Sequence, residues 1–165
     1  MNKKKILLLI FSWLFVAFSV SIITYFALQN GEDSSKTSSG VVDTIIEALP
    51  NGENITEKQK VEINISIRQL AHFSIYLLLG FTMANALKWT INSVNSVYLL
   101  LSLSASVQFS LFDEFVMQQN TVGRGAELKD VLTDSSGAML GTLGFSVIIF
   151  IISILIKKIK RKSIK

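Results

Sequence analysis

The chain has 165 residues, of which 50% are hydrophobic and 17% are charged. A soluble domain of this size could not bury so much apolar surface, whereas a lipid bilayer accepts it, so the composition indicates a membrane protein. The net charge of +4 could suggest nucleic-acid binding, but the basic residues gather at the chain ends beside apolar runs, as is typical of membrane anchors. We therefore expect no nucleic-acid partner. The absence of cysteine excludes disulfides and thiolate metal sites.

Four apolar runs are long enough to cross a membrane, since a helix needs roughly 20 mostly apolar residues to span the hydrocarbon core. They cover about residues 6–28, 66–87, 97–118 and 135–156. The first follows three lysines and resembles a signal peptide, but its apolar run is longer than an ordinary signal sequence, and we interpret it as an uncleaved anchor. The sequence predicts an all-α fold, an integral membrane four-helix bundle that forms one domain over residues 1–165.

The lysines and arginines predict the orientation of this bundle. If the N-terminus is cytoplasmic, ten of them lie on the cytoplasmic side and six lie outside. The residues beside the membrane at the two chain ends decide the orientation, because basic residues next to a span favour the cytoplasm. We expect both termini to be cytoplasmic.

A long extracytoplasmic loop, residues 29–65, is then expected between the first two spans. Its first part, residues 29–40, is rich in Ser and Gly, which predicts a flexible segment. A stripe of apolar residues follows and predicts a short amphipathic helix, lying on the membrane or on the bundle and stopped by Pro50-Asn51-Gly52. The stripe consists of Val41, Val42, Ile45, Ile46 and Leu49. Thr56-Glu57-Lys58-Gln59 has the spacing of a capping box that could begin the helix into the second span.

Ionisable and polar residues gather toward the outer ends of the last three spans. Such groups are expensive in lipid and indicate a functional site by default. Counting at the helical rise puts His72 roughly 22 Å and Asp113 roughly 24 Å above the inner ends of their spans, and so at one depth. We therefore expect His72 to lie within hydrogen-bond reach of Asp113 or Glu114, near Arg124. The candidate binding residues are Arg68, His72, Tyr76, Asp113, Glu114, Gln118, Arg124, Asp130 and Asp134.

Each of these residues also has a purely structural interpretation. His72 could bond a backbone carbonyl, and Asp113-Glu114 could end a helix near water. Arg124 and Asp130 could form a loop ion pair. Two further residues belong to a small face on the fourth span that favours close helix packing rather than chemistry; they are Gly137 and Gly141.

The chemistry of the cluster stays open at this point. His72, Asp113 and Glu114 are candidate catalytic residues, because burial among charges can give such groups useful pKa values. A metal site formed by His72, Asp113, Glu114 and Asp130 is conceivable, but the sequence contains one histidine and no cysteine, and for that reason we expect no metal site and no cofactor.

On these residues the chain resembles the VanZ-like family of small bacterial membrane proteins. The resemblance covers about residues 25–145, and its motifs include Arg68, His72, Tyr76, Asp113-Glu114, Gln118, Gly123-Arg124, Asp130, Asp134, Gly137 and Gly141. The chain departs from the family where a histidine and a glutamine often follow the Asp-Glu pair. Val116 and Met117 stand there, and Gln118 comes one position later.

The resemblance implies a function in the bacterial envelope, since the founding member is linked to reduced sensitivity to the glycopeptide teicoplanin. It implies a protein of the cytoplasmic membrane that contacts membrane lipids and acts at the outer face on an envelope lipid, a cell-wall precursor or a glycopeptide. One alternative is an integral-membrane enzyme with His72 or Glu114 as general acid or base. Another is a small transporter, which four spans without an internal repeat do not favour.

Overall fold

The computed structural model describes residues 2–50, 54–91 and 97–162. Every regular element in these ranges is a helix, which confirms the predicted all-α fold. In chain order the elements are α1 (Lys3–Ala27), α2 (Gly31–Ala48), α3 (Glu57–Ile91), α4 (Val97–Phe112), the π-helix η2 (Asp113–Met117), the 3₁₀-helix η3 (Gln118–Asn120) and α5 (Leu128–Lys162).

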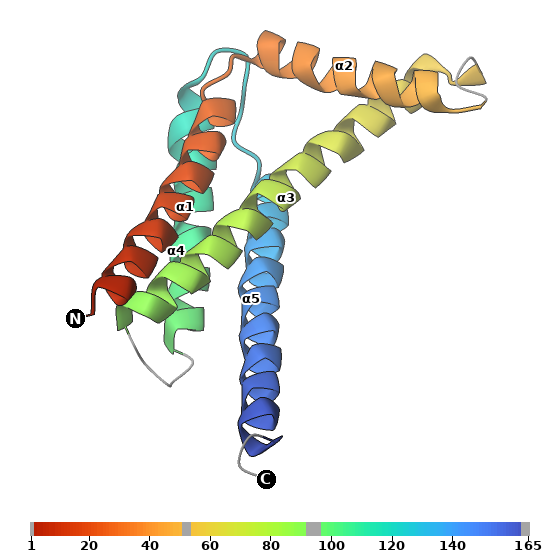
Figure 1. Ribbon diagram of the computed structural model, residues 1–165. Coiled ribbons are helices and arrows are strands. Elements are labelled where there is room, and N and C mark those ends of the chain that lie inside the picture. Colours follow the sequence, from red (N-terminus) through yellow and green to blue (C-terminus); the bar gives the residue numbers. More distant parts are fainter. Residues whose placement is uncertain (1, 51–53, 92–96, 163–165) are drawn as a thin grey trace.

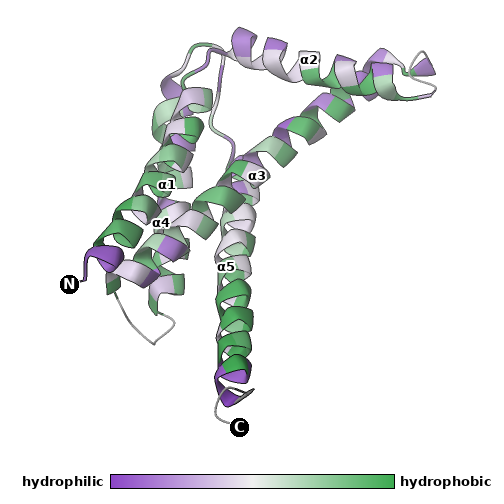
Figure 2. Ribbon diagram, in the orientation of Figure 1, coloured by the Kyte–Doolittle hydropathy of each residue, from purple (hydrophilic) through white to green (hydrophobic). Residues whose placement is uncertain are grey.

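Four helices in the described ranges have the length and apolar composition needed to cross a membrane. They are α1, α3, the continuous helix Val97–Asn120 and α5. Figure 2 shows apolar residues along α1 and the lower half of α5, and large hydrophobic side chains such as Phe15 and Phe150 are exposed there. Lipid tails cover such faces without cost. α1 begins and α5 ends at the same end of the bundle, away from α2 (Figure 1), as an even number of spans requires.

The helix α3 is the centre of the bundle and contacts α1, α2, α4 and α5. Its crossing with α5 is close because glycines lie on both helices at the contact. A methyl group added at Gly137 would meet the backbone of Phe73, and one at Gly141 would meet the backbone of Leu77. Gly144, one turn further along α5, has open space beside it. The backbones of the two helices are therefore in contact at Gly80, Gly137 and Gly141.

Hydroxyl groups link the helices inside the bundle. Ser102 on α4 donates a hydrogen bond to the Gly80 carbonyl at 3.1 Å and lies 3.1 Å from the hydroxyl of Thr142 on α5. Ser19 on α1 and Thr82 on α3 are joined in the same way at 3.2 Å. Each hydroxyl is buried, and a polar group in an apolar interior has to be hydrogen-bonded to avoid a desolvation penalty.

The segment between the first two spans differs from its prediction. Residues 29–40 are not a flexible segment, because α2 already begins at Gly31. Asn30 caps this helix, since its side chain accepts a hydrogen bond from the Asp33 amide at 2.7 Å. An ion pair of 2.7 Å between Lys36 and Glu32 adds support one turn later. Local capping and pairing thus outweigh a composition that is typical of loops.

The amphipathic part of α2 follows the prediction, with Val42 and Ile46 buried and the helix packed along α3. The helix ends at Ala48, before Pro50, while Asn51 and Gly52 lie outside the described residues. α2 therefore packs against α3 and runs from the upper end of α1 toward the projecting start of α3 (Figure 1).

The helix α3 begins at Glu57, well before the predicted start of the second span at residue 66. The predicted capping box forms: Gln59 Oε1 accepts the Thr56 amide at 2.9 Å, and the Gln59 amide donates to Thr56 Oγ1 at 3.4 Å. α5 likewise begins at Leu128 rather than residue 135. Both helices project beyond their predicted apolar spans on the side of α2. Asp130 and Asp134 lie on the projecting turns of α5, whereas Arg68, His72 and Tyr76 lie within the predicted span of α3.

Candidate functional site

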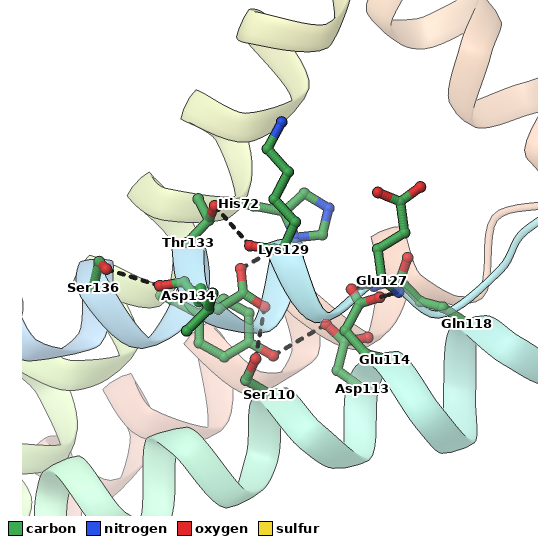
Figure 3. A network of polar contacts seen from close by, with 12 residues as sticks. His72, Ser110, Asp113, Glu114, Gln118, Glu127, Lys129, Thr133, Asp134 and Ser136 are labelled. Atoms are coloured by element: carbon green, nitrogen blue, oxygen red, sulfur yellow. Dashed lines mark hydrogen bonds and ion pairs between the residues drawn. The ribbon is translucent and has the colours of Figure 1, made fainter.

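Ionisable side chains from three helices meet at the end of the bundle nearest α2 (Figure 3). His72 comes from α3, Asp113 and Glu114 come from η2, and Asp134 comes from α5. The three carboxylates have exposed fractions of 2%, 0% and 0%. This burial excludes one interpretation left open by the sequence, in which Asp113 and Glu114 end a helix near water.

Asp134 is the hydrogen-bond partner of His72, at 3.2 Å between its Oδ1 and the ring Nδ1. It also accepts the hydroxyl of Ser110 at 2.8 Å. From the sequence we expected Asp113 or Glu114 in this role. Counting at the helical rise puts Asp134 roughly 33 Å above the inner end of its span, and so nearer the outer surface than His72. Counting residues along parallel helices put Asp134 at the wrong height relative to His72. The reason is that α3 and α5 cross at an angle and approach closely at their glycines (Figure 1). Asp113 is instead bonded to Tyr76, whose hydroxyl donates to Oδ2 at 3.0 Å.

Glu114 is held by two donors from the chain that follows it. The side-chain amide of Gln118 donates to Oε1, and the backbone amide of Glu127 donates to Oε2 at 3.2 Å. Both oxygens of a fully buried carboxylate are therefore hydrogen-bonded, and the orientation of the side chain is fixed.

The π-helical turn η2 explains how Gln118 reaches Glu114 from a position one residue later than the family pattern. A π-helix bonds residue i to residue i+5 and so takes up one more residue per turn than an α-helix. The extra residue rotates Gln118 back to the buried face, where its exposed fraction is 3%. The same turn keeps the adjacent side chains of Asp113 and Glu114 both inside.

Arg124 lies in the connection between η3 and α5 and holds the end of α1. Its Nη1 donates to the carbonyls of Phe26 at 2.6 Å and Ala27 at 3.4 Å. Burial, followed by the nearby charge of Arg68, lowers the pKa of the Arg124 guanidinium, which nevertheless stays protonated in a protein. No ion pair between Arg124 and Asp130 is found in the described residues. The loop ion pair considered from the sequence is therefore not formed.

The start of α2 is attached to the same connection. The Gly31 amide donates to the Val122 carbonyl at 2.9 Å, and a methyl group on Gly31 would collide with the Gly123 carbonyl. Gly123 has a φ of 74°, a conformation that glycine adopts readily. The close contact of these two backbones depends on glycine at both positions.

A cavity of about 240 Å³ lies between α1, α2, α3 and η2. Its apolar wall includes Ile23 and Phe26 of α1 and Ile75 of α3. Its polar lining contains most of the predicted binding residues, namely Arg68, His72, Tyr76, Asp113, Gln118 and Arg124. Glu114, Asp130 and Asp134 are not part of the lining and lie behind it.

Two groups of potential metal ligands occur in this cluster. A ring nitrogen of His72 and carboxylate oxygens of Glu114 and Asp130 lie within 4.8 Å of one another. Oxygens of Asp113, Glu114 and Asp134 form a second, fully buried group by the same measure. Glu114 belongs to both groups.

Sequence reasoning overlooked Ser110, which donates to Asp134, and the α2 residues Ser34 and Thr37, which line the cavity. The position of Ser110 could have been found from the spacing of serines in this span. Buried polar residues recur there at every fourth position, at Ser102, Ser106 and Ser110. A face of that kind on an apolar helix indicates the interior of a bundle. The α2 residues carried no such signal, because their part of the chain was taken for a flexible loop.

Four apolar helices that enclose a buried polar cluster define a multi-pass helical membrane protein. The chain matches the VanZ/LLP1 family over residues 11–152 and belongs to that family. No curated protein and no solved structure matches it in the corresponding comparisons.

Proposed function

We propose that this VanZ/LLP1-family protein binds an anionic envelope lipid or lipid-linked cell-wall precursor in the cavity beneath α2, at the outer face of the bacterial cytoplasmic membrane. In this proposal the bound ligand is the route by which the protein affects glycopeptide sensitivity. The observation that carries the proposal is the presence of two arginines, Arg68 and Arg124, on the wall of one cavity.

The two guanidinium groups favour an anion. Burial and then the charge of Arg68 lower the pKa of Arg124, while the charges of three nearby carboxylates act in the opposite direction. Neither arginine forms an ion pair in the described residues. An anion between them would relieve the repulsion between the two guanidinium groups. Arginine suits this role because its planar fork can give two parallel hydrogen bonds to a phosphate or carboxylate.

The rest of the cavity favours an amphiphile. One wall of the cavity is apolar and consists of side chains of α1 and α3, namely Ile23, Phe26 and Ile75. A volume of about 240 Å³ is below the range of pockets that enclose whole drug-sized ligands, so it suits a headgroup whose chains extend into the bilayer. The amphipathic α2 covers this headgroup site as a lid.

Native mass spectrometry of the purified protein tests the proposal. Phosphatidylglycerol, a polyprenyl phosphate and zwitterionic phosphatidylcholine would be offered separately at equal concentration. We expect retention of one or both anionic lipids and at least tenfold weaker retention by Arg68→Ala. Lys129→Ala is the matched control, since Lys129 is an exposed cation that does not line the cavity. Equal retention of all three lipids, or equal loss in both variants, would contradict the proposal.

An integral-membrane enzyme is the second candidate. The observation that favours it is the bond from His72 to the buried Asp134, with His72 itself on the cavity wall. A carboxylate that orients a histidine toward a bound ligand is a common arrangement for general acid–base catalysis. Turnover would appear as a change in the mass of the bound lipid on incubation with wild-type protein, absent in His72→Gln.

A further inference from the structure

The group formed by His72, Glu114 and Asp130 has features of a metal site that the sequence did not predict. These residues come from α3, η2 and α5, and each offers one ligand atom within 4.8 Å of the other two. Binding of one ion, with metal–ligand distances of about 2.0–2.2 Å, would require these atoms to move closer together. Glu114 is held by its hydrogen bonds, so the half-buried Asp130 side chain would make most of this movement. We infer that they bind a divalent cation of the Mn²⁺ class beside the cavity.

The orientation of His72 supports this inference. Its Nδ1 is engaged by Asp134 at 3.2 Å, so Nε2 is the ring nitrogen left for a ligand. A histidine that binds a metal usually donates its other ring N–H to a carboxylate, which fixes the tautomer and the direction of the ring. Asp134 is fully buried and serves this purpose without competing for the same nitrogen.

Hydrogen bonds also hold the Glu114 carboxylate in position to bind a cation. Gln118 and the Glu127 amide each donate to one of its oxygens, and these bonds leave further lone pairs available for a cation. Supported ligands of this kind are typical of metal sites, where the outer hydrogen bonds hold the inner ligands in place.

The charge of the cluster also calls for a cation. Asp113, Glu114 and Asp134 are buried together, and Asp130 lies beside them, half-buried. No lysine or arginine forms an ion pair with any of the four in the described residues. The buried Oδ1 of Asp113 has no hydrogen-bond partner among those residues either. Arg124 acts on Asp113, Glu114 and Asp130 by charge without forming an ion pair with them in the described residues. Carboxylates in a dry interior repel one another, and a divalent ion next to Glu114 would offset the repulsion that Arg124 does not balance.

The ligand set selects the class of ion. Carboxylate oxygens suit hard cations such as Mg²⁺ and Mn²⁺, whereas an imidazole suits transition metals such as iron and zinc. A set of two carboxylates and one imidazole therefore fits a divalent transition ion, and Mn²⁺ is the ion of that kind that carboxylates favour. His72 and Asp130 are both half-buried, so one side of the site stays accessible. Water or an oxygen of a ligand in the neighbouring cavity would complete the coordination there.

Titration with MnCl₂ alone tests the inference, because dissolved Mn²⁺ has a six-line electron paramagnetic resonance signal that weakens when the ion is bound. The full-length protein would be treated with a chelator, returned to detergent buffer and titrated. We expect one bound Mn²⁺ per chain and at least tenfold weaker binding by Glu114→Gln and by Asp130→Asn. Glu127→Gln should bind as the wild type does, since this exposed carboxylate belongs to neither group of ligands.

Absence of Mn²⁺ binding to the wild type, or unchanged affinity in Asp130→Asn, would overturn the inference. Asp130→Asn keeps the test valid if Glu114→Gln does not fold, because the Asp130 side chain is half-buried and makes no hydrogen bond in the described residues. The titration contains no added lipid. Its result is therefore independent of whether the cavity binds the anionic ligand proposed above.

Discussion

At the scale of single residues, Asp134 connects three helices through one carboxylate. Its two oxygens take hydrogen bonds from His72 of α3 and Ser110 of α4, while its own backbone belongs to α5. The two ends of the His72–Asp134 pair differ in environment: the side chain of His72 is 18% exposed and that of Asp134 is 0% exposed. Their removal should therefore have different consequences.

We expect Asp134→Ala to unfold far more readily than His72→Ala. Loss of the aspartate leaves Ser110 without its acceptor in the interior and His72 without its partner, and breaking a buried charged pair from one side costs about 3–5 kcal/mol. Loss of the histidine leaves Ser110 in place and opens the remaining carboxylate to water. Thermal unfolding in detergent and quantitative membrane immunoblots measure the difference.

The same comparison separates site from scaffold. His72→Ala should accumulate in the membrane at close to the wild-type amount and still lose ligand-dependent function in the native mass spectrometry and Mn²⁺ assays. Asp134→Ala should lose abundance and function together. Equal stability of the two variants would mean that the Asp134 carboxylate is not a structural connection.

Much of the site at this scale could be predicted from the sequence, because charge inside an apolar chain is rare and therefore informative. Arg68, His72, Tyr76 and Asp113 do line one cavity. The individual partners could not be predicted, since they depend on the crossing of α3 and α5. That crossing depends on backbone contact at Gly137 and Gly141, which helical rise does not encode.

At the scale of elements, the glycine contacts between α3 and α5 can be tested directly. Gly141→Leu should reduce the yield of monodisperse protein and lower stability by about 1–3 kcal/mol or more, because the new side chain meets the Leu77 backbone, which cannot move aside. Gly144→Leu is the matched control on the same helix, with open space at the added atoms. Equal yields of the two variants on size-exclusion chromatography would argue against close packing at Gly141.

The π-helical turn η2 leads to a second prediction at this scale. Deletion of Val116 should be tolerated, because removal of one residue converts the wide turn to an α-helical turn and leaves both flanking helices in register. Deletion of Leu111 should abolish folding, because Leu111 lies within α4. Its loss rotates the residues that precede it on the helix by one residue position relative to those that follow. Both side chains are exposed, at 45% and 41%, so packing alone does not distinguish them. Membrane abundance and thermal unfolding measure the outcome, and equal damage by both deletions would contradict it.

Helices with a strong apolar pattern could be predicted from the sequence. The helix α2, whose start depends on capping hydrogen bonds, could not. The four spans follow from composition, and the capping box at Thr56 correctly indicated an early start of α3. The start of α2 at Gly31 escaped because its serines and glycines resemble a loop, although Asn30 and Asp33 form a sound N-terminal cap. Short-range hydrogen bonds make this segment helical, although its average composition is typical of a loop.

At the scale of the whole molecule, the charge distribution predicts which end faces the cytoplasm. Single cysteines can be placed without background, since the chain has none. We expect Lys36→Cys and Lys129→Cys to react with an impermeant thiol reagent in intact cells, and Lys158→Cys to react only after the membrane is broken. All three positions are exposed, so access is decided by the side of the membrane. Labelling of Lys158→Cys alone in intact cells would reverse the orientation.

The backbone bond between Gly31 and Val122 makes α2 and the connection that carries Arg124 mechanically dependent on each other. α2 cannot swing away about Asn30 without either breaking this bond or pulling the connection that carries Arg124. Arg124 in turn is fastened to the end of α1 through the Phe26 carbonyl. As long as the Gly31–Val122 bond holds, opening of the cavity would move one of its two positive charges, so that access and electrostatic attraction would change in a single movement.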